Sequence, residues 1–233
     1  MEKTHPEVLV TGGTSGLGLA IARGFASAGY SVTAAGLGPL PEPEPGLGFR
    51  SLDVTDAAAI GALLAGFSSL TVLVNAAGVI RRGAELEPDV FAEVVDINLI
   101  GTMRVCASAR PLLRESKGAI INIASMLSYF GGGLVPGYAA SKGGIAQLTK
   151  SLAIAYAADG IRVNALAPGW ISTPLTKDLR EDEDRSAAIL SRTPMGRWGK
   201  PEDLIGPALF LASEAAGFVT GTILNVDGGY AAA

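Results

Sequence analysis

A glycine-rich stretch between an apolar strand pattern and an apolar helical pattern constrains this fold more than any other feature. Residues 11–18 (TGGTSGLG) follow the apolar residues 8–10 and lead into the helical pattern of residues 19–26. Glycine permits positive φ and close approach of a ligand, and the free N–H groups at a helix N-terminus attract an anion. The stretch therefore predicts a strand, turn and helix that bind a pyrophosphate, although such turns also occur without a ligand.

Apolar strand patterns alternate with helical patterns along the rest of the chain. Uninterrupted apolar runs are typical of strands buried on both faces of a parallel sheet. The alternation predicts an α/β fold with an open, doubly wound parallel sheet, and ligands at the carboxyl ends of its strands. No Pro/Ser-rich linker interrupts the chain, so we expect one domain over residues 1–233. The predicted strands after the first are residues 31–35, 49–54, 70–74, 119–124, 161–167 and 222–226.

Composition narrows the class of function. With 48% hydrophobic and 17% charged residues, the chain can form a large core. A net charge of −4 without a basic stripe argues against a nucleic-acid partner. Cys106 is the only cysteine, which excludes an intrachain disulfide and a multi-cysteine metal site, and no metal is predicted. Residues 1–7 lack the apolar core of a signal peptide and no long apolar run follows, so we expect a soluble cytoplasmic protein without a membrane partner.

Proton transfer in this chain needs a side chain other than histidine, because the single histidine, His5, precedes the first strand. Tyr138 and Lys142 are four residues apart in a helical pattern and therefore share one helix face. A lysine ammonium within ~4–6 Å favours the phenolate and lowers a tyrosine pKa. Ser125, after the strand of residues 119–124, could then hold a substrate oxygen while the tyrosine transfers its proton. Alone, such a Tyr-x-x-x-Lys pair is more often a surface tyrosine beside a solvated lysine.

The end of the second strand bears on the choice of cofactor. An acid there binds the adenosine ribose hydroxyls, and a base there binds a 2′-phosphate. This chain has Gly36-Leu37-Gly38 at that place and Ser15 before Gly16, so neither position offers a cation. These residues favour NAD over NADP.

Other segments predict local structure around the strand ends. The proline-rich residues 39–46 predict an exposed loop in place of the second crossover helix. The third strand is expected to end on Asp53, which either accepts a hydrogen bond from an adenine amino group or forms a turn. Asp56 is expected to cap a helix over residues 57–66. The charged residues 176–192 predict a mobile helical flap over the strand ends.

Taken together, these motifs resemble the short-chain dehydrogenase/reductase family over nearly the entire chain. The resemblance implies a Rossmann-type, three-layer α/β/α fold with about seven strands, in a homodimer or homotetramer. Two departures from the family pattern are Ala76, in place of the usual second asparagine, and the missing acid of the second strand. The motifs are Thr11-Gly12-x-x-x-Gly16-x-Gly18, Asp53, Asn75-Ala76-Ala77-Gly78, Asn98, Ser125, Tyr138-x-x-x-Lys142 and Pro168-Gly169.

The same resemblance implies a role for each motif residue. Tyr138 is the expected acid/base and Ser125 orients the carbonyl. Lys142 anchors the ribose and modifies the tyrosine pKa, and Asn98 holds a water in a proton relay. The residues implied to bind NAD, with NADP the less favoured cofactor, are Gly12, Thr14, Ser15, Gly16, Leu17, Gly18, Asp53, Val54, Asn75, Ala76, Ala77, Gly78, Tyr138, Lys142, Pro168, Gly169, Ile171 and Thr173.

A narrower group within the family, the 2-dehydro-3-deoxy-D-gluconate 5-dehydrogenases, is similar in residues 78–82, 122–128, 196–199 and 203–207. That likeness implies NAD-dependent oxidation of a secondary hydroxyl on a sugar acid, whose carboxylate needs a cation. The alternatives are a 3-oxoacyl thioester reductase, a polyol dehydrogenase and a dinucleotide-sensing binding protein. An acid/base set argues against the last, because a sensor needs none. The candidate cations are Arg81, Arg82, Lys177, Arg180, Arg185 and Arg192.

Overall fold

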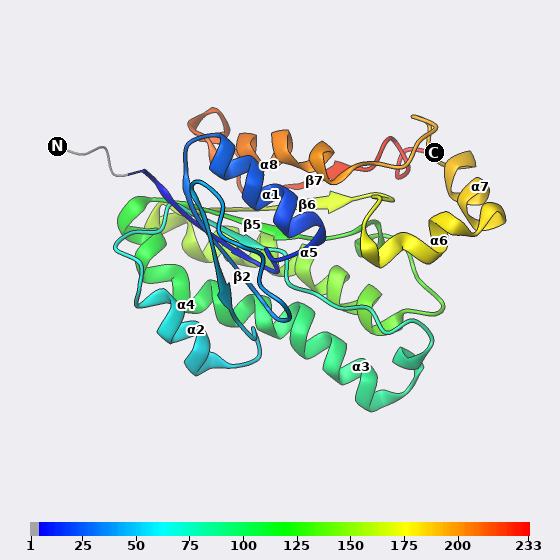
Figure 1. The fold of residues 1–233 in the computed structure, drawn as a ribbon, viewed down its shortest axis with the longest axis horizontal. Coiled ribbons are helices and arrows are strands. Elements are labelled where there is room, and N and C mark those ends of the chain that lie inside the picture. The colour runs from blue at the N-terminus through cyan, green and yellow to red at the C-terminus, as the bar shows by residue number, and fades with distance from the viewer. Residues whose placement is uncertain (1–4) are drawn as a thin grey trace.

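One seven-stranded sheet organises the computed structural model, which describes residues 5–233 (Figure 1). Its strand order is β3-β2-β1-β4-β5-β6-β7, and all neighbouring strands are parallel. The Rossmann-type sheet expected from the sequence is confirmed. Residues 1–4, part of the segment compared with a signal peptide, lie outside the described residues. The strands are β1 (Glu7–Thr11), β2 (Ser31–Gly36), β3 (Leu47–Ser51), β4 (Val72–Asn75), β5 (Ala119–Ile123), β6 (Arg162–Pro168) and β7 (Ile223–Val226).

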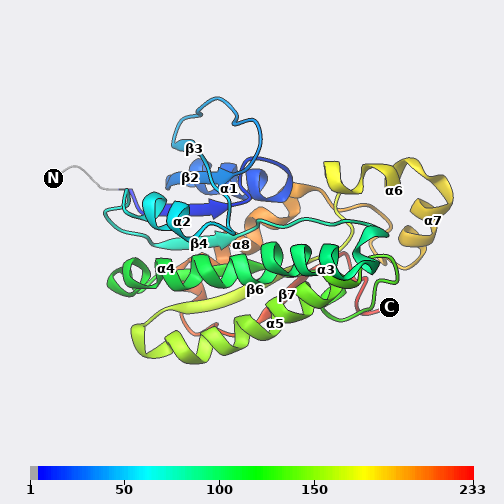
Figure 2. The ribbon, with the colours of Figure 1, turned by 90° about the horizontal axis from the view of Figure 1, so that it is seen from below.

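Helices cover both faces of the sheet and form the two outer layers. α1 and α8 pack on one face, and α2, α4 and α5 pack on the other (Figures 1 and 2). Across the described part of the chain, no helix combines the length and apolarity that a membrane crossing requires. The helices are α1 (Gly16–Ser27), α2 (Ala57–Leu64), α3 (Pro88–Val95), α4 (Gly101–Ser116), α5 (Pro136–Tyr156), α6 (Lys177–Glu181), α7 (Glu183–Ser191) and α8 (Ile205–Ala212).

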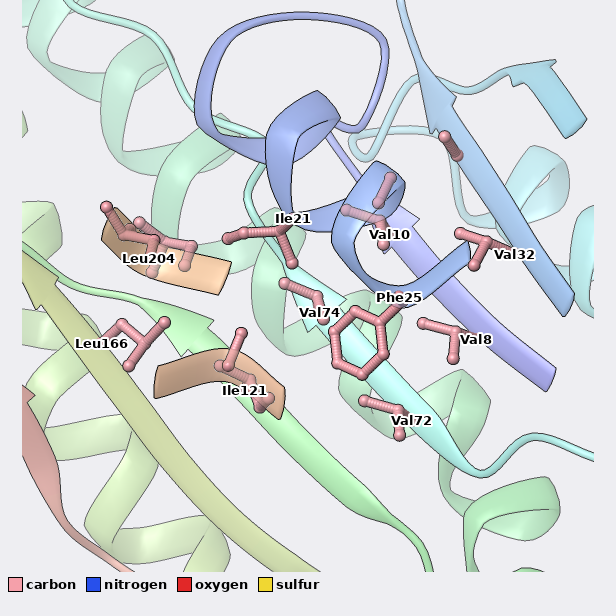
Figure 3. Close-up of a cluster of buried hydrophobic side chains, with 14 of the residues drawn as sticks. Val8, Val10, Ile21, Phe25, Val32, Val72, Val74, Ile121, Leu166 and Leu204 are labelled. Atoms are coloured by element: carbon pink, nitrogen blue, oxygen red, sulfur yellow. The ribbon is translucent and has the colours of Figure 1, made fainter. Parts of the chain in front are cut away.

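Successive side chains of the strands point alternately into two hydrophobic cores, one on each face of the sheet. Val8 and Val10 of β1 pack with Phe25 of α1 in the core shown in Figure 3. Leu9, between them, lies in the second core with Leu113 of α4. Successive side chains of a strand point to opposite faces, so the uninterrupted apolar runs serve both cores at once.

The strand order reverses between β1 and β4, which places the two predicted ligand-binding turns side by side. Thr11 and Asn75, the last residues of these strands, are register partners. In open α/β sheets such a reversal opens a crevice at the carboxyl ends of the strands. α6 and α7 lie beyond this end of the sheet (Figure 2), so the helical character predicted for residues 176–192 is confirmed.

The connection between β2 and β3 contains no helix, as the prolines predicted. Residues 37–46 form a mostly exposed loop, tied to α1 by a 2.6 Å ion pair between Arg23 and Glu44.

Several expected boundaries were wrong by one to three residues, and β4, for example, begins at Val72 rather than at residue 70. β3 ends at Ser51 rather than reaching residue 54, because Asp53 Oδ1 accepts hydrogen bonds from Thr55 that turn the chain. α2 ends at Leu64 rather than residue 66, where Gly66 N bonds back to Leu63 O in a tighter turn. The predicted cap by Asp56 is present, since its carboxylate accepts hydrogen bonds from the first-turn amides.

Candidate active site

Two adjoining cavities open at the carboxyl ends of the strands. The large cavity, of about 820 Å³, is lined by the turn after β1, the ends of β2 and β3, the turn after β4 and the start of α5. The small cavity, of about 420 Å³, lies between the segments that follow β5 and β6. Residues of the predicted cofactor site that line the large cavity are Gly12, Thr14, Ser15, Gly16, Leu17, Gly18, Asp53, Val54, Ala76, Ala77, Gly78, Tyr138, Lys142 and Thr173.

The glycine turn has the geometry of an anion-binding site. Gly12 has φ +68°, and a Cβ there would lie 2.5 Å from the carbonyl carbon of Ala76. A Cβ on Gly18 would collide with the carbonyl oxygen of Gly12. Ser15, the N-cap of α1, makes no side-chain capping bond, so the first N–H groups of the helix are left for a ligand. The residues present therefore fit the phosphates of a dinucleotide.

Asn75, predicted to bind cofactor, lines neither cavity. Its Nδ2 donates to Asn122 Oδ1 at 2.9 Å and to Cys106 Sγ at 3.2 Å beneath the turn. Buried polar groups need partners, so this side chain joins β4 to β5 and α4. Burial raises the pKa of the Cys106 thiol to about 12, which leaves it protonated.

Asp53 forms the turn that was one of its two predicted roles. Its Oδ1 accepts hydrogen bonds from Thr55 N at 2.8 Å and Thr55 Oγ1 at 2.7 Å, which hold the pKa of Asp53 below its usual value. The residue also lines the large cavity. Contact with adenine stays a prediction.

Tyr138 stands at the junction of the two cavities and lines both, whereas Ser125 lines the small one. Burial raises the pKa of Tyr138, hydrogen bonding by the Ser125 side chain lowers it, and the negative charge of Glu85 raises it again. The net direction is upward. Lys142 is not among the groups that shift this pKa in the chain alone, so the lowering expected from Lys142 stays a prediction.

Burial also acts on Lys142, because it disfavours the charged form of the lysine. The side chain is 5% exposed, and its Nζ donates to the carbonyl of Ile123 at 2.7 Å. Burial lowers the pKa of Lys142 to about 8. Its Nζ lies 5.5 Å from the centre of the Tyr138 ring, as a shared helix face requires.

Two buried polar side chains, Asn98 and Ser141, connect the backbone of Tyr138 to the loop after β4 by hydrogen bonds. Asn98, in the π-helical segment η2 (Asp96–Ile100), bonds through its amide to both backbone groups of Val79 and to Ser141 Oγ at 3.1 Å. Ser141 Oγ donates in turn to the Tyr138 carbonyl at 2.7 Å. Asn98 lines neither cavity, and its water-holding role stays a prediction. Ser141 was missed because nothing in the local pattern distinguishes it from other helix serines.

The small cavity carries positive charge and no acidic side chain. Of the six candidate cations, Arg82 and Arg192 line it. Arg192 extends from the end of α7, with its guanidinium carbon 4.5 Å from the centre of the Tyr230 ring. Arg81 instead pairs with Glu93 at the edge of the large cavity. The other predicted residues that line the small cavity are Pro168, Gly169, Ile171 and Thr173.

Comparison with known proteins finds relatives that match nearly the whole chain. The family model described as enoyl-(acyl carrier protein) reductase matches residues 12–231. The chain is 44% identical over 239 residues to 2-dehydro-3-deoxy-D-gluconate 5-dehydrogenase of Pseudoalteromonas atlantica, covering 95% of this chain and 94% of that protein. It is 43% identical over 236 residues to the enzyme of that name from Bacillus subtilis, covering 95% and 93%.

A solved structure shares the fold. The crystal structure of gluconate 5-dehydrogenase from Burkholderia cenocepacia, in complex with NADP and tartrate, superposes with a TM-score of 0.90 at 33% identity. The match covers 98% of this chain and 96% of that one.

Proposed function

Because the chain belongs to the short-chain dehydrogenase/reductase family, we propose that it interconverts a secondary alcohol and a ketone of a sugar acid. As its relatives show, the chain is an NAD(P)-dependent oxidoreductase that acts on CH–OH groups. The proposed substrate class is that of 2-dehydro-3-deoxy-D-gluconate, acted on within one catalytic domain in the cytoplasm. The observation that carries it is the small cavity beside Tyr138, which has two arginines and no acid.

The chain's own residues divide the proposed chemistry among them. The nicotinamide, when bound, supplies the ring that exchanges hydride with the substrate and, when oxidised, a positive charge. Ser125 holds the substrate oxygen, the Tyr138 phenolate takes the alcohol proton during oxidation, and the Tyr138 hydroxyl returns that proton during reduction. Lys142 binds the ribose and, below its pKa of about 8, keeps a positive charge near the phenol. Asn98 and Ser141 keep the backbone of Tyr138 in place.

The rival proposal of a 3-oxoacyl thioester reductase needs a cationic surface for an acidic carrier. The flap does not supply one, because its charges are mixed in sign and two of its cations pair with its own acids. Lys177 lies 3.8 Å from Glu181, and Arg185 lies 3.2 Å from Asp182. The arginines of the small cavity instead suit the carboxylate of a small substrate.

The proposed function is tested by offering purified protein and NAD several classes of alcohol. We expect NADH absorbance to appear with sugar acids, at a kcat/KM well above that for neutral polyols and hydroxyacyl thioesters. Preferential turnover of a thioester would overturn the assignment. Binding of NADH without turnover of any class would favour a dinucleotide sensor.

We also propose a preference for NAD, although the B. cenocepacia relative was crystallised with NADP. Gly36 and Leu37 line the large cavity without a charge, and a Cβ on Gly36 would lie 2.7 Å from Thr14 Oγ1. No cation therefore stands where a 2′-phosphate is usually bound. We expect kcat/KM to be about tenfold higher with NAD, since one charge-assisted contact is missing for NADP.

Exchange of Leu37 tests the reason for this preference. L37R should raise kcat/KM for NADP, whereas L40R, in the same loop but outside the cavity, should not. Equal or better use of NADP by the unaltered protein would contradict the proposal.

Self-association is the remaining proposal, as a homodimer or homotetramer. Large apolar side chains stand exposed away from the cavities, among them Ile154 on α5 and Phe218 after α8. Burying such side chains between copies of the chain would remove apolar surface from water, which favours association.

A further inference from the structure

The start of α5 lacks a cap of its own, although this helix carries Tyr138. Val135 occupies the N-cap position and makes no side-chain bond, Pro136 follows it, and the first turn contains no acid. An N-cap side chain normally accepts a hydrogen bond from the second or third N–H of a helix. Here the acceptor comes from a distant segment: Glu85 Oε2 accepts from Tyr138 N at 2.8 Å.

Glu85 is placed for this contact by a short 3-10 helix, η1 (Ala84–Leu86), in the loop after β4. The side chain is 1% exposed, and its other oxygen accepts from Arg81 N at 2.7 Å. A Cβ on Gly137 would stand 3.3 Å from Oε2, so glycine at that position lets the carboxylate approach. Within residues 5–233 Glu85 has no ion-pair partner, and the positive end of α5 offsets its charge.

The same loop carries Arg82 of the small cavity. Besides the Glu85 contacts, Gly83 N donates to Leu134 O at 2.7 Å, so the loop is joined to the start of α5 at two places. The carboxylate thus links the segment that bears Arg82 to the residue that bears the reacting hydroxyl. Loss of this link would displace both groups relative to a bound substrate.

We propose that Glu85 is a positioning residue, which caps α5 at Tyr138 and sets the Tyr138 hydroxyl against the arginine-bearing loop. This inference rests on the proposed role of Tyr138. Holding the helix start with a full negative charge has a cost, because that charge raises the pKa of Tyr138. The other charged or titratable groups that line the two cavities with Tyr138 are Lys142, Asp53, Arg81, Glu93 and Asp96 in the large one, and Arg82, Arg192 and Tyr230 in the small one.

The Glu85→Gln variant tests whether Glu85 positions Tyr138 or only stabilises the fold. The amide keeps the size of the side chain but replaces one acceptor by a donor and removes the charge. We expect kcat to fall about tenfold, as small displacements of a reacting group do, with little change in the KM for NAD. The pKa seen in the pH profile of kcat should fall, because the charge that raises it is gone. Glu85→Asp keeps the charge but is shorter, so it should lower kcat without that shift.

Two controls make the outcome decisive. Glu87→Gln removes the same charge from an exposed residue two positions along and should leave kcat and the pH profile unchanged. The ultraviolet titration of Tyr138, taken as the difference between each variant and the same variant carrying Tyr138→Phe, needs no substrate. It should show a lower pKa in E85Q even if sugar acids are not turned over.

A lower melting temperature in E85Q with unchanged kcat, titration and pH profile would reduce Glu85 to a fold-supporting role and overturn the proposal. Failure of the sugar-acid assay with a shifted titration would instead count against the proposed substrate alone.

Discussion

Replacing Tyr138 with phenylalanine should abolish most turnover while leaving the cofactor site intact. The substitution removes one oxygen atom, at the junction of the two cavities, and with it the group that exchanges a proton with substrate. General acid–base groups contribute roughly 10²- to 10⁴-fold to rates, and we expect a fall in kcat of that size. NADH affinity, measured by fluorescence titration, should stay nearly unchanged, because the glycine turn is untouched.

The pH dependence of kcat gives a second test of the role of Tyr138. Only the phenolate can accept the alcohol proton, so kcat for oxidation should rise with pH through the ionisation of Tyr138. Burial raises the pKa of this phenol in the chain alone, so the rise should lie on the alkaline side unless bound cofactor lowers it. In the Tyr138→Phe variant this rise should disappear.

Tyr129→Phe is a matched control, because Tyr129 is half exposed, bonds to Asn225 and lines neither cavity. It should keep normal turnover. Near-normal activity in Tyr138→Phe would show that another group transfers the proton.

Removing both arginines of the small cavity should weaken binding of acidic substrates selectively. Each guanidinium can offer a charge-assisted hydrogen bond to a carboxylate, worth about 1.5 kcal/mol. Arg192→Leu should therefore raise KM for a sugar acid about tenfold, and the Arg82→Leu/Arg192→Leu double variant about 100-fold. The KM for a neutral polyol should change little, because a polyol has no carboxylate that loses its partner when the arginines are removed.

Arg180→Leu is the matched control, since Arg180 belongs to the same flap but lines neither cavity. It should keep the KM of the unaltered protein. Equal losses for acidic and neutral substrates would mean that Arg192 supports the flap, through its contacts with Tyr230 and Phe130, rather than recognising charge.

Local patterns in the sequence were enough to predict the fold and to place Tyr138 beside Lys142, the pair to which we assign the chemistry. β1, the glycine turn and α1 follow one another directly in the sequence. The need for glycine at positions 12 and 18 can therefore be predicted from neighbouring residues alone. Tyr138 and Lys142 are neighbours by helical spacing alone. The prolines of residues 39–46 exclude a helix by their own geometry.

Other features of the site depend on contacts between distant segments. The direction of the Asn75 side chain depends on Asn122 in the next strand, and two of six candidate cations reach the small cavity because of how the flap and the loop after β4 pack. No motif near Tyr138 predicts that Glu85, 53 residues earlier, caps its helix.

The sequence by itself determined which groups we propose for binding a dinucleotide and moving a proton, because those groups are set by short-range spacing. Only the tertiary structure decided how these groups are aligned and which surroundings shift their pKa values. Burial raises the pKa of Tyr138, and a carboxylate from another segment caps the helix that carries this residue. Desolvation and long-range hydrogen bonds arise only when the chain is packed, so no local pattern encodes them.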